Sequence, residues 1–78
     1  MLVLIKIYPN PASDYFVIQT SSDQTKTIRI HNTQGTLFKQ FETNDATFRV
    51  NTVGFGAGLF TVIVYDDERF YSTRIKVL

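Results

Sequence analysis

Two prolines separated by one residue place the strongest constraint on how this chain can fold. The sequence Tyr-Pro-Asn-Pro-Ala occupies residues 8–12 and follows a short apolar run that begins at Leu2. Proline fixes φ near about −65° and lacks a backbone N–H, and the residue before a proline favours extended geometry. Neither a helix nor a continuous β-ladder can therefore pass through Pro9 and Pro11. The chain must turn here, and the side-chain oxygens of Asn10 and Asp14 are suited to bond the freed backbone.

Alternation of apolar and polar residues with period two dominates the sequence, and no segment sustains a helical period. The alternation predicts seven strands, at residues 3–8, 15–20, 26–31, 36–41, 47–51, 59–65 and 69–77. Turn signals separate them, and Gly35 is expected to take a positive φ in a tight turn. The pattern predicts an all-β fold, a seven-stranded antiparallel immunoglobulin-like β-sandwich, with residues 1–78 as one domain.

The sixth predicted strand, residues 59–65, is apolar on both of its faces. This pattern predicts a central strand that is buried on both sides. The side turned away from the core would then be covered by loops or long neighbouring side chains, or would form a surface for a partner.

Charge and composition argue against several classes of protein. Eight basic and seven acidic residues give a net charge of +1, which lacks the basic excess of a nucleic-acid-binding domain. The chain has no cysteine and therefore no disulfide or thiolate metal site. The apolar run at residues 1–5 is interrupted by Lys6 and is too short for a signal peptide or a membrane span. If the protein is exported, its export signal is expected to lie upstream, and the chain is then a fragment of a larger secreted protein with an added start methionine.

The residues able to support chemistry form no convincing constellation. His31 is the only histidine, and its spacing from Ser13 and Asp14 does not indicate a triad, so a solvated histidine at a strand end is expected. The glycines of residues 54–58 lack the spacing and following helix of a dinucleotide loop and suggest a loop that packs its backbone closely. The acidic residues 66–68 suggest a solvated turn rather than a calcium site. The sequence predicts no enzymatic activity, no catalytic residue, no metal site and no cofactor.

The ordered motifs resemble the type A C-terminal sorting domain of the type IX secretion system (Por secretion) of Bacteroidota-type bacteria. That family opens with an apolar strand and a Tyr-Pro-Asn-Pro-Ala box, which residues 7–12 match. An alternating strand with a turn and glycine follows, as at residues 28–35, and later a Leu-Pro-Ala-Gly-x-Tyr box that residues 55–60 resemble. Residues 74–77 resemble its closing strand of mixed basic and apolar residues. Three departures are Gly56 in place of proline, Phe60 in place of tyrosine, and an end at Leu78 without the usual final Lys or Arg.

The resemblance implies a secretion signal at the C-terminus of a cargo protein, without catalysis of its own. Such cargo passes the periplasm, crosses the outer membrane through the type IX translocon, and reaches the cell surface or medium, where a sortase typically removes the domain. The implied partners are the translocon, the sortase and an N-terminal cargo domain in the same chain, with no nucleic acid and no small-molecule substrate. The resemblance assigns translocon recognition to Pro9, Asn10, Pro11, Gly35, Gly58, Phe60, Arg74 and Lys76.

The closing strand gives this interpretation a recognition mechanism, and the tyrosines leave one alternative function open. The closing strand is expected to offer a sheet edge that pairs through its backbone, with Arg74 and Lys76 supplying positive charge. The alternative is an immunoglobulin-like accessory module that binds carbohydrate or a surface protein, or one that only spaces or stabilises an enzyme. Carbohydrate binding would require Tyr15, Tyr65 and Tyr71 to form one exposed stacking surface.

Overall fold

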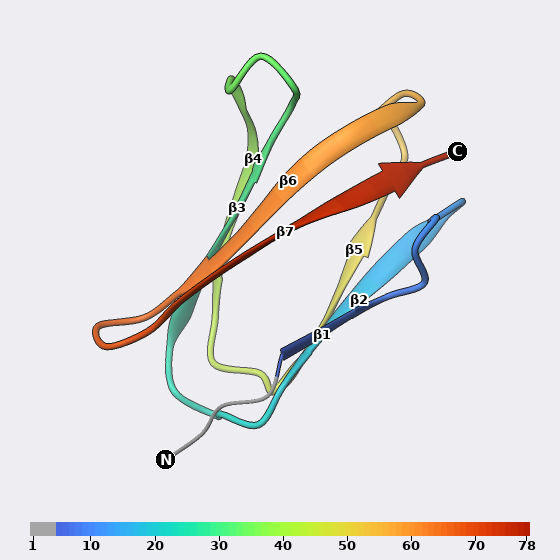
Figure 1. Ribbon diagram of the computed structural model, residues 1–78. Helices are drawn as coiled ribbons and strands as arrows, with labels where there is room; N and C mark the ends of the chain where they lie inside the picture. The colour runs from blue at the N-terminus through green and yellow to red at the C-terminus, as the bar shows by residue number, and fades with distance from the viewer. Residues whose placement is uncertain (1–4) are drawn as a thin grey trace.

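The computed structural model describes residues 5–78 as seven strands in two antiparallel sheets that pack face to face (Figure 1). One sheet has the strand order β1-β2-β5 and the other has the order β4-β3-β6-β7. Inner residues of both sheets form one core, which confirms the predicted immunoglobulin-like β-sandwich. The strands are β1 (Ile5–Tyr8), β2 (Tyr15–Thr20), β3 (Lys26–His31), β4 (Leu37–Thr43), β5 (Thr47–Asn51), β6 (Gly58–Tyr65) and β7 (Phe70–Val77).

The strand bounds follow the alternation of the sequence closely, and three of them coincide with the predicted ranges. The largest difference is at β4, which continues past the predicted end at Phe41 because Glu42 and Thr43 still pair with the start of β3. Strands β6 and β7 each begin one residue away from the predicted position. The predicted start of the first strand, at residues 3 and 4, lies outside the described residues.

Aliphatic and aromatic side chains on the facing sides of the two sheets form the core. Phe16 is fully buried on β2, and its ring meets Phe55 edge-on with centroids 6.4 Å apart. Phe55 in turn contacts Phe60 at 5.1 Å and Phe38 at 4.9 Å. Burying one such side chain stabilises the fold by about 1.5–3 kcal/mol, so this group anchors one end of the sandwich. The buried apolar residues are Ala12, Phe16, Ile18, Ile28, Ile30, Val50, Phe55, Phe60, Val62, Val64, Ile75 and Val77.

Strand β6 lies between β3 and β7, as expected of a central strand, but only one of its faces is fully buried. Val62 and Val64 point into the core. On the other face Leu59 is 45% exposed, and Thr61 and Ile63 are half-buried. The prediction that β6 is buried on both sides is therefore wrong for the outer face, which no second layer covers within residues 5–78.

The glycines serve backbone conformation rather than close packing. Gly35 takes a φ of +82° in the turn between β3 and β4, as predicted, and its N–H donates to the Asn32 carbonyl at 3.0 Å. In the loop before β6, Gly54 and Gly56 have φ values of +86° and +75°. A Cβ added at any of these positions would meet no atom within 4 Å. The predicted close packing of this loop is therefore wrong, and positive φ explains its glycines.

Candidate recognition surface

The Pro-Asn-Pro-Ala segment, residues 9–12, binds along the end of β7 and is called the box below. Asn10 Nδ2 donates to the carbonyl oxygen of Arg74 at 3.2 Å, and the N–H of Lys76 donates to Asn10 Oδ1 at 3.0 Å. A single asparagine side chain thus bonds both a donor and an acceptor of the strand. Both prolines follow cis peptide bonds.

Ala12 extends this contact with backbone bonds. Its N–H donates to the Lys76 carbonyl at 2.8 Å, and its carbonyl accepts the N–H of Leu78 at 2.8 Å. Ala12 forms an isolated parallel bridge with Val77 and is fully buried. Figure 1 shows the C-terminal end of the chain beside the loop that joins β1 to β2. The box therefore closes the outer edge of β7 from the carbonyl of Arg74 to the N–H of Leu78.

The residues predicted for recognition fall into two groups. Pro9, Asn10, Pro11, Gly35, Arg74 and Lys76 are exposed. Phe60 is only 6% exposed and packs in the aromatic core, and Gly58 is half-buried at the start of β6, paired with Val77. The Asn10 side chain bonds the backbone of Arg74 and Lys76. Phe60 and Gly58 lie on the neighbouring strand β6, where they pair with Ile75 and Val77 of β7.

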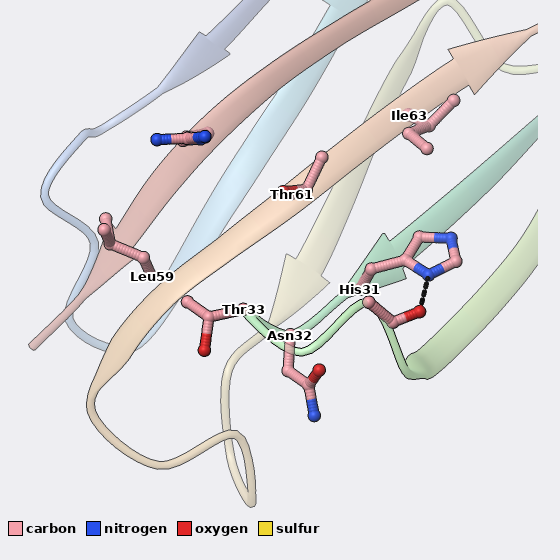
Figure 2. Close-up of a pocket in the computed structure, with 8 residues that line it drawn as sticks. His31, Asn32, Thr33, Leu59, Thr61 and Ile63 are labelled. Atoms are coloured by element: carbon pink, nitrogen blue, oxygen red, sulfur yellow. Dashed lines mark hydrogen bonds between the residues drawn. The ribbon is translucent and has the colours of Figure 1, made fainter.

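A shallow groove lies on the outer face of the β4-β3-β6-β7 sheet, with a volume of about 380 Å³ (Figure 2). Leu59, Thr61 and Ile63 of β6 form its floor, and the turn after β3 and Arg74 of β7 border it. Because Thr61 pairs with both His31 and Arg74, these side chains share one row across the sheet.

His31 lies at the end of β3, as predicted, and is half-buried at this groove. Its Nδ1 lies 3.1 Å from the Gly35 carbonyl oxygen. Figure 2 marks this hydrogen bond of His31 with a dashed line. Since a carbonyl only accepts, Nδ1 must carry the proton of this hydrogen bond. The histidine therefore holds the turn that contains Gly35, which gives it a structural task.

The structure does not assemble a catalytic triad from His31, Ser13 and Asp14. The carbonyls of Ser13 and Asp14 accept hydrogen bonds from Thr52 at 2.7 and 3.0 Å, next to the β1-β2-β5 sheet, whereas His31 belongs to the other sheet. No group of three or more His, Asp or Glu side chains within residues 5–78 is placed to hold a metal ion. The same residues include no helix long and apolar enough to span a bilayer.

The acidic turn between β6 and β7 is organised by Asp66. Its Oδ1 accepts the backbone N–H groups of Glu68 at 2.8 Å and Arg69 at 2.7 Å. These hydrogen bonds favour the charged carboxylate and hold the pKa of Asp66 below its usual 3.8. The carboxylate thus fixes the hairpin that starts β7.

Replacing Asp66 with asparagine is expected to reduce the acid sensitivity of the domain. A depressed pKa in the folded state contributes stability above the unfolded value of 3.8, and this contribution disappears as pH falls below it. We expect Asp66→Asn to show a smaller shift in urea midpoint than the native domain between about pH 6 and about pH 2.5. Asp67→Asn, which leaves both turn hydrogen bonds in place, is the matched control. Equal shifts for the native and Asp66→Asn domains would contradict this role.

Two features of the structure lie beyond the sequence prediction. Lys26 is only 5% exposed, and its Nζ donates to the Asp45 carbonyl at 2.9 Å, which ties the start of β3 to the β4–β5 turn. The pairing of Asn10 with Arg74 joins residues 64 positions apart. The only hint of Lys26 burial is its place on the inward-facing side of an alternating strand. Asn10 is indicated by its position between two prolines, which lack a backbone N–H, so its side-chain amide adds a donor and an acceptor to a donor-poor segment.

Comparison with known proteins supports the resemblance seen in the motifs. The model of the secretion system C-terminal sorting domain family matches residues 6–77. No curated protein matches the chain. Among solved structures, PorZ, an essential surface component of the type IX secretion system of Porphyromonas gingivalis, superposes with a TM-score of 0.79 at 24% identity. The match covers 95% of this chain and only 11% of the PorZ chain, so it establishes a shared fold. Because the family match spans nearly the whole sequence, the chain belongs to the secretion system C-terminal sorting domains.

Proposed function

We propose that this domain directs an attached cargo protein across the outer membrane through the type IX secretion system. The observation that carries the proposal is the family match over residues 6–77. In this proposal the cargo precedes the domain in the same chain and passes through the periplasm. A surface sortase then removes the domain, and the cargo stays at the cell surface or enters the medium. The sorting-domain family is not a family of enzymes, and the domain acts as a binding partner of the translocon.

We further propose that the translocon recognises a folded surface rather than a linear segment. Support comes from the contact between Asn10 and the Arg74–Lys76 segment, because these residues meet only in the folded domain. The exposed members of the predicted set are Pro9, Asn10, Pro11, Gly35, Arg74 and Lys76, and these are assigned to direct contact. Phe60 and Gly58 are assigned to shaping that surface from below.

Truncation is a poor way to test the closing strand. Removing residues 74–78 would take Ile75 and Val77 from the core together with the partners of the box. Loss of export would then follow from unfolding alone. Substitutions of exposed side chains separate recognition from folding, since such changes usually alter the unfolding free energy by less than about 0.5 kcal/mol.

A two-host export assay tests the proposal. A fluorescent reporter with its own signal peptide is fused to the N-terminus of the domain and expressed in a type IX-competent host and in its translocon-deficient mutant. We expect reporter at the surface or in the medium of the first host and in the periplasm of the second. The same reporter without the domain is the control. Periplasmic retention of a folded fusion in both hosts would overturn the proposed function.

The carbohydrate-binding alternative has less support from the placement of the tyrosines. Tyr15 stacks under Arg49, 3.9 Å from its guanidinium carbon, on the β1-β2-β5 sheet. Tyr65 belongs to the other sheet, on the outward-facing side of β6. Tyr71 pairs with the buried Val64 and so faces the inner side. Three aromatic rings on three different sides of the molecule form no common platform for a sugar.

A further inference from the structure

We propose that the first half of β7, from Phe70 to Arg74, is an open sheet edge on which an extended segment of the export machinery pairs as an additional strand. The proposal rests on the proposed function and names the contact through which the domain would be recognised. It differs from recognition at the end of β7, because that part of the edge is already occupied by the box.

The hydrogen bonds of the box show which backbone groups of β7 remain open. Alternate residues of an antiparallel strand direct their N–H and C=O groups to opposite neighbours. Since Lys76 bonds Asn10 and Ala12, the even-numbered residues of β7 face away from β6. Within residues 5–78, the outward N–H and C=O of Phe70 and Ser72 and the N–H of Arg74 have no backbone partner. These unpaired groups form a short, regular row along the edge of β7, and the row ends where the box begins.

The other edge strands are protected against pairing in a way that this segment is not. Each carries a basic residue near its middle: Lys6 on β1, Lys39 on β4 and Arg49 on β5. Lys39 also pairs with the buried Ile30, next to a register shift in the β3–β4 ladder. Charged and inward-facing residues and bulges are common devices that keep edge strands from associating. β7 also carries a basic residue near its middle, Arg74, but residues 70–73 before it are uncharged and form the longest uncharged stretch on an edge strand within residues 5–78.

The side chains along the open edge define the partner. Phe70 is 70% exposed, and Ser72 and Arg74 follow it on the outer face. Residues directly opposite each other on paired strands interact, and opposite charges attract there. An extended segment that places an apolar residue opposite Phe70 and a carboxylate opposite Arg74 therefore fits. Backbone pairing would supply affinity and these two positions specificity, as in other cases of strand addition.

Substitution of Ser72 by proline tests the edge directly. Proline removes an N–H that faces away from β6, so it blocks a new strand while leaving the β6–β7 ladder intact, and edge strands tolerate it. In the reporter fusion we expect Ser72→Pro to lower the ratio of surface to periplasmic reporter at least about tenfold. Ser72→Ala, which keeps the N–H, is expected to match the native ratio. The urea midpoint of each purified domain establishes that the variants are folded.

A charge reversal provides a second, independent variant. We expect Arg74→Glu to reduce export by roughly tenfold, because it repels the carboxylate of the partner. Lys39→Glu, the same reversal on β4, is expected to leave export unchanged. If Ser72→Pro does not fold, Phe70→Pro replaces it, because it removes another backbone N–H that faces away from β6, and Phe70→Ala is its control.

The outcomes separate this inference from the proposed function. One outcome is that the native fusion is exported and the folded Ser72→Pro and Arg74→Glu fusions are exported at the same level. This result would overturn strand pairing at the open edge of β7 and leave the sorting function intact. Loss of export with Ser72→Pro alone would support strand pairing and overturn the proposed carboxylate opposite Arg74. Loss of export with Arg74→Glu alone would overturn strand pairing at this edge. Retention of the native fusion in the competent host would overturn both.

Discussion

Replacing Phe16 with alanine is expected to remove a large part of the stability of this domain. The Phe16 side chain is fully buried between the sheets, and Phe→Ala changes at such positions cost about 3–5 kcal/mol. A domain of this length has a total unfolding free energy of only about 4–12 kcal/mol. Urea unfolding followed by circular dichroism should show either no cooperative transition or a midpoint far below that of the native domain.

The matched control for this prediction is Phe70→Ala. It removes the same atoms from a side chain that is 70% exposed, so the expected loss is within about 0.5 kcal/mol. Similar midpoints for Phe16→Ala and Phe70→Ala would contradict the core described for the sandwich.

The second large effect is expected from Asn10→Ala. This change removes both side-chain hydrogen bonds to β7, and each such bond contributes about 0.5–1.5 kcal/mol. Because water can replace the lost partners at this exposed position, we expect a loss of about 1–2 kcal/mol in unfolding free energy. Amide hydrogen exchange of Lys76 should accelerate at the same time, since its N–H loses its acceptor.

Two further variants make the Asn10 prediction specific. Asn10→Asp keeps an acceptor for the Lys76 N–H but loses the donor to the Arg74 carbonyl. Its unfolding free energy should therefore lie between that of Asn10→Ala and that of the native domain. Asn44→Ala changes an exposed asparagine in the β4–β5 turn and is expected to have little effect. An unchanged rate of amide hydrogen exchange at Lys76 in Asn10→Ala would contradict the hydrogen bonding of the Asn10 side chain to β7.

Much of the fold could be predicted because the local sequence determines it. Strand β5 alternates strictly between apolar and polar residues, and its predicted bounds coincide with the structure. The positive φ of Gly35 could be predicted because the tight turn between two antiparallel strands needs a residue that readily adopts it. The motif order was also sufficient to indicate the family that the comparison establishes.

The features that the sequence did not reveal depend on contacts between distant segments. The end of β4 could not be placed because Glu42 and Thr43 are polar, and only their pairing with β3 makes them part of the sheet. The partial exposure of β6 follows from the lack of a covering layer on its outer face, which its apolar sequence conceals. For the same reason, the contact of Asn10 with β7 appears only once the strand order is known.

The claim that a folded surface is the sorting signal is tested most directly by comparing two reporter fusions in one type IX-competent host. One carries the native domain and the other Phe16→Ala, a change in a fully buried side chain that no partner can contact in the folded state. The quantity measured is the surface-to-periplasm ratio of full-length fusion. We predict surface reporter for the native domain and periplasmic retention for Phe16→Ala. Equal surface export of the two fusions, with Phe16→Ala shown to be unfolded, would contradict recognition of a folded surface.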